Sequence, residues 1–237
     1  MNLILSLFPG IGLLDMAFEA EGFCVVRGPD LLWGGDIRKF HPPAGRFDGV
    51  IGGPPCQLYG GLANFSHRWK HPPEHLIPEF ERCVGETRPE WLLMENVQGA
   101  PLPAVSGYWV ADVLLNNRWF GEEQSRIRRF SFGTARGLTL RLEDFAALEH
   151  PEFRQAVTSA NKGQRKTHAK KTGGTITHYP LADALRLQGL PPDFLEHCPL
   201  TDRGARKVVA QGVPLPMGRA IARAVKAALA AKAEATA

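Results

Sequence analysis

The sequence lacks paired cysteines and long apolar runs. Its four cysteines, Cys24, Cys56, Cys83 and Cys198, form no Cys-x-x-Cys pair, and no basic and apolar signal pattern precedes them. We therefore expect reduced thiols in a cytoplasm, and no disulfide framework. No apolar stretch approaches the roughly 18 residues that a membrane-spanning helix requires, so we expect no membrane partner.

Metal-binding patterns are also missing. His67, His71 and His75 repeat every four residues, a spacing that would face a metal from one side of a helix. Pro72 and Pro73 lie between the last two histidines and would break that helix. The sequence therefore predicts no metal site.

Charge is nearly balanced over the whole chain but unevenly distributed. The 237 residues include 28 Lys and Arg against 24 Asp and Glu, and 44% are hydrophobic, as in ordinary globular proteins. Residues 151–178 hold six basic residues and one acid, Glu152. A concentrated positive stretch attracts phosphate groups, although a solvated lysine-rich loop would have the same composition.

Hydrophobic periodicity predicts an α/β fold, because short apolar runs alternate with helix-period segments. A helix that starts at Leu13 and stops before Gly22 is expected to place Asp15 and Glu19 on its polar face. Between Thr134 and His178 the periodicity is weak, which indicates an insertion between two regular parts. The expected strands are 3–7, 23–26, 47–51, 91–94, a short one around 119–120, and 130–132; the other expected helices are 78–84, 108–115, 142–148, 181–187 and 217–233.

The first strand is followed by the turn Phe8-Pro9-Gly10-Ile11-Gly12, and acids follow where later strands should end. Two glycines allow a ligand to approach the backbone, and the next helix offers free N–H groups. Asp30 and Asp36, the latter followed by Ile37, stand where acids hold ribose hydroxyls or a base amino group. The combination favours a cofactor that contains a nucleoside, against the alternative of a plain turn and solvent-facing acids.

A second group of residues favours nucleophilic chemistry. The strand that ends at Ile51 leads into Gly52-Gly53-Pro54-Pro55-Cys56-Gln57, a rigid corner that carries a thiol. A thiolate is a strong nucleophile, although most cysteines are inert. The next strand ends in Glu95-Asn96-Val97, and alternation in an extended segment points Gln124, Arg126 and Arg128 to one face. Two guanidinium groups and an amide suit a phosphate or a carbonyl oxygen, or a salt-bridged edge strand.

In this order the segments resemble the DNA cytosine-5 methyltransferase family. The resemblance runs from about residue 3 to residue 229. It departs from the family pattern at Asp30, at Leu58-Tyr59-Gly60-Gly61, at Gln211-Gly212, and in the short gap between residues 128 and 186. The matching segments are Phe8–Gly12, Asp36-Ile37, Gly53–Gln57, Glu95–Val97, Gln124–Arg128, Arg186–Pro191 with Phe194, and Gly212–Pro214.

The resemblance implies a Rossmann-like class I S-adenosylmethionine-dependent methyltransferase fold, with a mixed, mostly parallel sheet and helices on both faces. Residues 1–133 and 179–237 would form the catalytic core and 134–178 a reduced target-recognition insertion, which should read a site of about two to four base pairs. It also implies a monomeric, cytoplasmic enzyme of prokaryotic or phage origin that acts on double-stranded DNA.

The resemblance also assigns residues. Cys56 would add to C6 of cytosine, Glu95 would share a proton with N3, Arg128 would hold O2, and Arg126 would contact phosphates. The cofactor, S-adenosylmethionine, would be bound by Phe8, Gly10, Gly12, Asp30, Asp36, Ile37 and Pro55. Nucleic acid would be bound by Gln57, Asn96, Gln124, Arg165, Lys166, Lys170 and Lys171.

Three alternatives stay open. A minority of the family acts on tRNA, and a short recognition region is compatible with that substrate. A catalytically silent relative would only bind nucleic acid, but intact Cys56, Glu95, Arg126 and Arg128 argue against it. An unrelated dinucleotide enzyme would need a third glycine at position 15, where the chain has Asp15.

Overall fold

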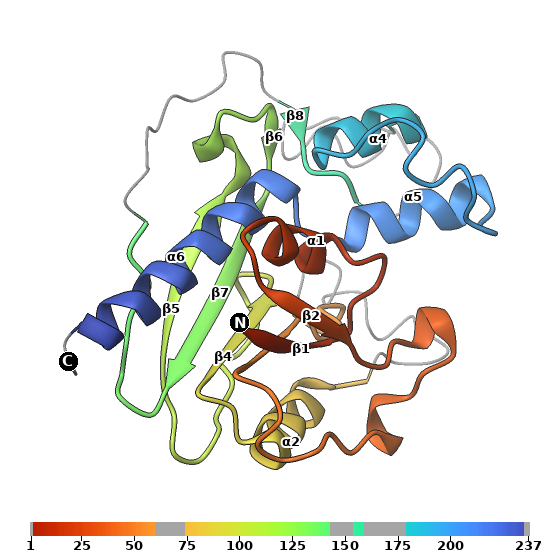
Figure 1. Ribbon diagram of the computed structural model, residues 1–237. Helices are drawn as coiled ribbons and strands as arrows, with labels where there is room; N and C mark the ends of the chain where they lie inside the picture. The colour runs from red at the N-terminus through yellow and green to blue at the C-terminus, as the bar shows by residue number, and fades with distance from the viewer. Residues whose placement is uncertain (1, 60–73, 143–153, 159–178, 235–237) are drawn as a thin grey trace.

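The computed structural model describes residues 2–59, 74–142, 154–158 and 179–234. A six-stranded sheet runs through the molecule in the order β2-β1-β3-β4-β7-β5 (Figure 1). The strands β1 (Leu3–Leu7), β2 (Cys24–Arg27), β3 (Gly49–Gly52) and β4 (Trp91–Asn96) are parallel. β7 (Ile127–Thr134) is antiparallel to both β4 and β5 (Trp109–Asn116). The sheet is therefore mixed and mostly parallel, as the sequence predicts.

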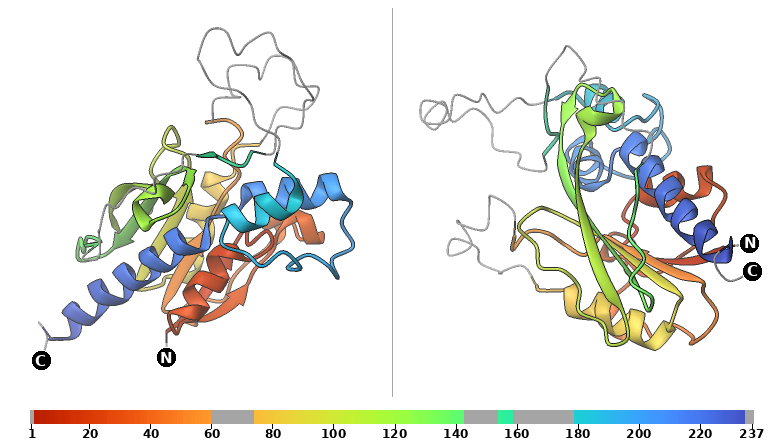
Figure 2. Two further views of the ribbon diagram at one scale, coloured as in Figure 1. Left: turned by 90° about the horizontal axis from the view of Figure 1, so that it is seen from above. Right: turned by 90° about the vertical axis from the view of Figure 1, so that its left-hand side faces the viewer.

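Helices cover both faces of this sheet (Figure 2). α1 (Leu13–Ala20) and α6 (Leu215–Glu234) pack together on one face, where Phe18, Trp91, Phe132 and Ile221 belong to one buried cluster. α2 (Ile77–Thr87) covers the other face, with Phe80 and Val84 against Leu5 and Val50. None of the helices in the described ranges is long and apolar enough to cross a membrane.

A smaller unit completes the described chain at one end of the sheet. It contains α4 (Leu181–Leu187), α5 (Asp202–Gln211) and a two-stranded parallel pair, β6 (Gln124–Ser125) with β8 (Arg154–Gln155). Short 3₁₀ helices lie at Leu31–Trp33, Ile37–Lys39 and Asn117–Phe120. α5 was not anticipated, although Thr201 caps it by accepting a bond from the Gly204 N–H, a signal that the sequence does carry.

Two expected elements are wrong. Residues 108–115 were expected to be helical, but residues 109–116 form β5, which pairs with β7 along its whole length. Ala111 and Asp112 are poor strand formers, so long-range pairing overrides local propensity here. The expected strand around Trp119 and Phe120 is a 3₁₀ turn, which Asn116 caps. The expected helix at 142–148 falls almost wholly outside the described residues.

Asp15 was expected on the polar face of its helix, and this is also wrong. Its side chain is completely buried and accepts bonds from Ser6 Oγ at 2.5 Å and from Arg27 Nε at 2.9 Å. Burial raises the pKa of Asp15, while the bonds from Ser6 and Arg27 oppose this rise. Glu19 is exposed, as expected. The buried carboxylate ties α1 to β1 and β2 beneath the turn that joins β1 to α1.

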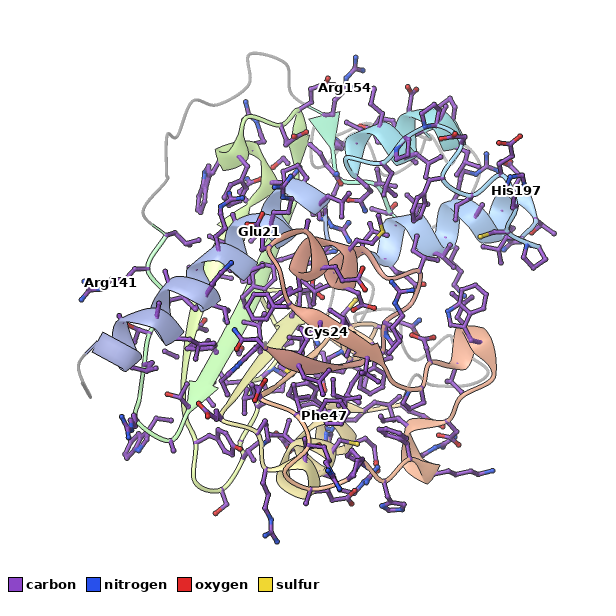
Figure 3. All side chains as sticks on the ribbon, in the orientation of Figure 1. Glu21, Cys24, Phe47, Arg141, Arg154 and His197 are labelled. Atoms are coloured by element: carbon purple, nitrogen blue, oxygen red, sulfur yellow. The ribbon has the colours of Figure 1, made fainter. Side chains whose placement is uncertain are left out.

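Ionic contacts on the surface fix α6 against the end of α1. Glu21 Oε1 accepts from Arg219 Nε at 2.8 Å and from Arg223 at 3.2 Å, and the Glu21 carbonyl accepts from Lys226 at 3.0 Å. Figure 3 shows Glu21 between these two helices. Arg219, Arg223 and Lys226 of α6 therefore face the end of α1.

Gly49 allows the close approach of two parallel strands. It pairs with Trp91, and a Cβ on Gly49 would overlap the Trp91 indole, which is itself buried. We expect Gly49→Ala to lower the free energy of unfolding by about 1–3 kcal/mol, because the indole must leave its packed position. Urea unfolding followed by circular dichroism would measure the change.

The matched control for this prediction is Gly85→Ala in α2. A Cβ on Gly85 meets no heavy atom within 4 Å, so this alanine is expected to be neutral or to stabilise by up to about 1 kcal/mol. Equal unfolding midpoints for the two variants would contradict the assignment of Gly49 as a packing glycine.

Candidate active site

Three parallel strands and one antiparallel strand bring the expected site residues to one edge of the sheet. In the strand register Leu7 lies beside Gly52, and Gly52 beside Met94. The segments that follow β1, β3 and β4 therefore leave the sheet together. β7 starts at this edge, because Arg129 pairs with Asn96 and Phe130 with Glu95.

The turn after β1 has an unusual backbone. Phe8, Gly10 and Gly12 have φ angles of 57°, 57° and 82°, and only the glycines adopt such values without steric cost. A bulky residue at positive φ is often found where function requires the backbone shape. A Cβ on Gly10 would meet no heavy atom within 4 Å, so the space beside this turn is open. Gly12 caps α1, whose first N–H groups remain available to a ligand.

Asp30 connects this turn to the loop after β2. Its carboxylate accepts from the Gly10 N–H at 2.8 Å and from the Leu32 N–H at 2.7 Å. Each carboxylate oxygen has room for a further bond, which leaves capacity for a ligand hydroxyl. Asp30 therefore lies where the sequence analysis expected an acid beside the glycine turn.

Trp33 belongs to the same region and was missed in the sequence. Its indole Nε1 donates to the Gly10 carbonyl at 2.7 Å, while the side chain stays largely exposed beside the also exposed Leu31. An aromatic ring held against a glycine turn offers a flat surface to a planar ligand. The available signal was an aromatic residue three positions after the acid, in a loop too short for a helix.

Asp36 and Ile37 lie next along the same loop. Asp36 forms a two-pronged ion pair with Arg38, in which both distances are 2.9 Å, and its pKa is lowered by these bonds. Arg38 also pairs with Glu74 at 3.0 Å. Ile37 is buried in the core on the α2 side. Both carboxylate oxygens of Asp36 therefore already accept hydrogen bonds, which leaves less capacity to bind the amino group of a base than the sequence alone indicated.

The corner that carries Cys56 is fixed by the loop after β4. The Asn96 amide donates to the Pro54 carbonyl at 3.1 Å, and Asn96 is buried. A Cβ on Gly99 would lie 2.8 Å from the Tyr59 carbonyl oxygen, so the absence of a side chain permits this contact. Pro55 and Cys56 are half-buried and Gln57 is exposed. Asn96, expected to contact nucleic acid, instead supports the Pro54-Pro55-Cys56 corner.

Glu95 and Arg128 form the ionic centre of this edge. Glu95 Oε1 lies 2.9 Å from Arg128 Nε, and both side chains are largely buried. Burial raises the pKa of Glu95, and the charges of Arg128 and Arg126 only partly oppose it. Burial therefore favours the protonated form of this carboxyl group more than water does.

The Cys56 thiol responds to the same charges. Burial raises its pKa, the nearby Glu95 carboxylate raises it further, and Arg128 and Arg126 lower it. The net direction is upward. The structure therefore does not hold a preformed thiolate, and neutralising Glu95 would favour the ionised sulfur.

Gln124 and Arg126 lie inside the protein rather than at its surface. The Gln124 amide donates to the Leu187 carbonyl at 2.6 Å. The Arg126 guanidinium donates to the carbonyls of Val157, Ala210 and Gly212, and burial lowers its pKa. The contacts expected with nucleic acid for Gln124 and with phosphates for Arg126 are thus replaced by contacts with the backbone. The alternation itself is confirmed, because positions 125 and 127 are the more exposed ones.

Four basic residues expected to contact nucleic acid lie outside the described residues. These are Arg165, Lys166, Lys170 and Lys171. The boundaries of the insertion at 134–178 and the assignment of residue roles stay predictions.

Comparison with known proteins agrees with this arrangement. The sequence model of the family described as C-5 cytosine-specific DNA methylase matches residues 33–103. The Type II methyltransferase M.FnuDI of Fusobacterium nucleatum is 31% identical over 169 residues, which cover 58% of this chain and 48% of that protein. M.NgoPII of Neisseria gonorrhoeae is 28% identical over 58% of this chain and 49% of its own length. The chain spans about half the length of these curated relatives.

Solved structures share the fold. The Entamoeba histolytica methyltransferase EhMeth superposes with a TM-score of 0.63 at 11% identity, covering 97% of this chain and 99% of the other. The S. pombe Dnmt2 methyltransferase gives 0.64 at 13% identity, covering 95% and 98%. The fold is that of the class I S-adenosylmethionine-dependent methyltransferases. Within this class, residues 33–103 and the wider matching region are similar to cytosine-5-specific DNA methylases.

The pKa relations predict how Cys56 reacts with iodoacetamide. Cys24 is exposed and Cys198 half-buried, so the measurement uses a Cys24→Ser/Cys198→Ser background. Cys83 is buried and burial raises its pKa to about 11, which keeps it unreactive. We expect alkylation of Cys56 to be slow at neutral pH and to accelerate with rising pH, with a midpoint above that of a free thiol.

Glu95→Gln should move this midpoint to lower pH, because it removes the negative charge that raises the thiol pKa. Glu196→Gln, which removes the same charge from an exposed position, is the control and should leave the midpoint in place. A midpoint that Glu95→Gln leaves unchanged or moves upward would contradict the coupling of Glu95 to Cys56.

Proposed function

We propose that this chain transfers a methyl group from S-adenosylmethionine to C5 of cytosine in double-stranded DNA. The observation that carries this proposal is the buried Glu95–Arg128 pair beside Cys56. A nucleophile, a proton-holding carboxyl and a guanidinium at one sheet edge match the three groups that activate cytosine. The similarity to cytosine-5-specific DNA methylases supports the same chemistry. We place the enzyme in the cytoplasm of a prokaryote or of a phage-infected cell, as a monomer.

Cys56 and Glu95 make the cytosine ring reactive. The Cys56 sulfur bonds to C6 as the C5–C6 double bond opens, and Glu95 supplies a proton to N3, so that electron density accumulates at C5. The raised pKa of Glu95 suits this proton transfer. Arg128 then donates to the cytosine O2, a charge-assisted contact that adenine and guanine cannot accept in the same place.

The residues beside the glycine turn fit the cofactor. Gly10 leaves open space, Asp30 keeps acceptor capacity for the ribose hydroxyls, and the Trp33 ring offers a surface for the adenine. Phe8, Gly12, Ile37 and Pro55 complete the proposed site, and Asp36 would meet the adenine amino group while it stays paired with Arg38. When bound, the sulfonium of S-adenosylmethionine supplies an electrophilic methyl group that C5 can attack.

The ring is then restored. The C5 proton is lost to a base, the C5–C6 double bond re-forms, and the Cys56 sulfur leaves with the electron pair of its C–S bond. None of these steps is possible inside a stacked duplex, so the target base must leave the helix at a cost of a few kcal/mol. We propose that DNA contacts made by Gln57, which is exposed beside Cys56, and by the basic stretch at 151–178 offset part of this cost.

Replacing Cys56 tests the nucleophile. We expect Cys56→Ala to abolish transfer of labelled methyl groups while DNA affinity stays within about threefold, since the thiol contributes to bond formation and little to binding. DNA containing 5-fluorocytosine should trap the wild type covalently, because fluorine cannot leave C5 as a proton does. Cys24→Ser is the control and should behave as the wild type. Methyl transfer by Cys56→Ala would contradict the assignment.

The same assay decides between substrates. Duplex DNA and tRNA are offered in parallel, and transfer to tRNA alone would replace the DNA proposal by the tRNA alternative. Binding without any transfer would identify a silent relative. Bisulfite sequencing of DNA from cells that express the protein would then give the methylated sequence.

The basic stretch makes a separate prediction. Neutralising Arg165, Lys166, Lys170 and Lys171 together should weaken DNA binding and reduce the slope of log affinity against log salt, by about 0.9 for each phosphate that the protein no longer neutralises. Arg46→Gln is the control, because Arg46 is exposed just before β3, at the opposite edge of the sheet. An unchanged slope in the fourfold variant would reject these residues as phosphate contacts.

A further inference from the structure

Gln124 connects the segments that precede and follow residues 159–178. Its carboxamide is completely buried, its Oε1 accepts from the Val157 N–H at 3.0 Å, and its Nε2 donates to the Leu187 carbonyl at 2.6 Å. Val157 lies before residues 159–178 in the chain and Leu187 lies after them. One side chain therefore holds the chain on both sides of residues 159–178, which include five of the six basic residues of the basic stretch.

Glu123 forms a second connection between the same segments. Its carboxylate accepts from Arg186 at 2.6 and 3.2 Å and lies 3.7 Å from Arg154 Nε. The Arg154 N–H also donates to the Glu123 carbonyl at 2.9 Å. Figure 3 shows Arg154 on β8, at the end of the molecule where α4 also lies. Tyr179 adds a direct link, because its hydroxyl donates to the Gln155 carbonyl at 3.1 Å.

Arg126 and Gln188 extend this network to the segment before α6. Arg126 bonds the Val157 carbonyl at 3.0 Å and the Ala210 carbonyl at 2.7 Å. Gln188 Nε2 donates to the Val209 carbonyl at 2.7 Å and to the Gly212 carbonyl at 3.2 Å. Both side chains are buried, where an unmatched polar group is costly. We call Gln124, Arg126 and Gln188 the polar junction.

The polar junction is joined directly to the reaction site. Arg128, which pairs with Glu95, follows Gln124 by four residues in an extended stretch, a distance of about 13 Å at the usual rise of a strand. β7 then continues as a central strand between β4 and β5. Gln124, which holds the segments at 157 and 187, and Arg128, which pairs with Glu95, therefore lie on one continuous, paired segment.

We propose that Gln124 is a positioning residue for DNA and makes no contact with DNA itself. By holding the segments at Val157 and Leu187 in register with Arg128, it sets where bound DNA presents its target base to Cys56. This inference rests on the proposed function. It also replaces the direct nucleic-acid contact that the sequence motif alone implies.

Gln124→Leu tests the proposal, because leucine has a similar size and removes both hydrogen bonds. We expect the KM for DNA to rise about tenfold, while the KM for S-adenosylmethionine and the rate of Cys56 alkylation stay within twofold of the wild type. Amide hydrogen exchange in residues 154–158 should accelerate at least tenfold, with no change in β4. Ile127→Ala, an exposed neighbour on the same segment, is the control for all four measurements.

Tyr179→Phe is the milder variant and keeps the proposal testable if Gln124→Leu does not fold. It removes one bond of the same connection and should raise the KM for DNA by two- to threefold. A wild-type KM and wild-type exchange in both variants would overturn the proposal. The proposal would also be overturned if Gln124→Leu slowed the alkylation of Cys56 by as much as it slowed methyl transfer. Gln124 would then support the whole site and not the position of DNA alone. If the wild type transfers no methyl group, the proposed function fails, and hydrogen exchange still tests the connection separately.

Discussion

The buried ion pair between Glu95 and Arg128 is the contact on which the arrangement of this site depends. Both side chains lie at the sheet edge with little exposure, and a buried charge is tolerated only when it is paired. The antiparallel direction of β7 makes the pair possible, since this strand starts at the edge where its parallel neighbour β4 ends. A parallel strand in the same place would bring Arg128 to the opposite edge. The mixed topology is therefore a requirement of this ion pair as well as a feature of the fold.

The surroundings of Cys56 follow from close backbone contacts. A Cβ on Gly53 would lie 3.2 Å from Glu95 Oε2, and one on Gly99 would lie 2.8 Å from the Tyr59 carbonyl. The Asn96 amide fixes the Pro54 carbonyl from the same loop. These contacts bring the thiol within the electrostatic influence of Glu95, which raises its pKa. We therefore expect the reactivity of this half-buried thiol to depend on the charge of Glu95.

Sequence reasoning predicted local features well and long-range partners poorly. The limits of β1 and α4 agree with the expected 3–7 and 181–187, because each is a short apolar segment with a clear boundary. The expected helix at 108–115 is wrong because eight pairings with β7 decide its conformation, and periodicity within the segment does not contain them. Asp15 was misplaced for the same reason, since its partners Ser6 and Arg27 lie on two strands. The sequence motif singled out Gln124 and Arg126 as site residues. It could not show that these side chains donate hydrogen bonds to the backbone carbonyls of residues 157, 187, 210 and 212.

One extended segment therefore performs two tasks. Residues 124, 126 and 128 point inward by the alternation of extended chain, but they meet different surroundings as the segment passes from the small β6–β8 pair into the main sheet. The first two find backbone carbonyls and hold the insertion, and the third finds Glu95 and faces the reaction site. Because the segment is paired at both of its ends, we expect a displacement of residues 154–155 to reach Arg128 rather than to be absorbed by a loop. This is how, in the proposed function, a short recognition region would align a base with Cys56: buried hydrogen bonds at residues 124 and 126, and not the size of the region, would set its position.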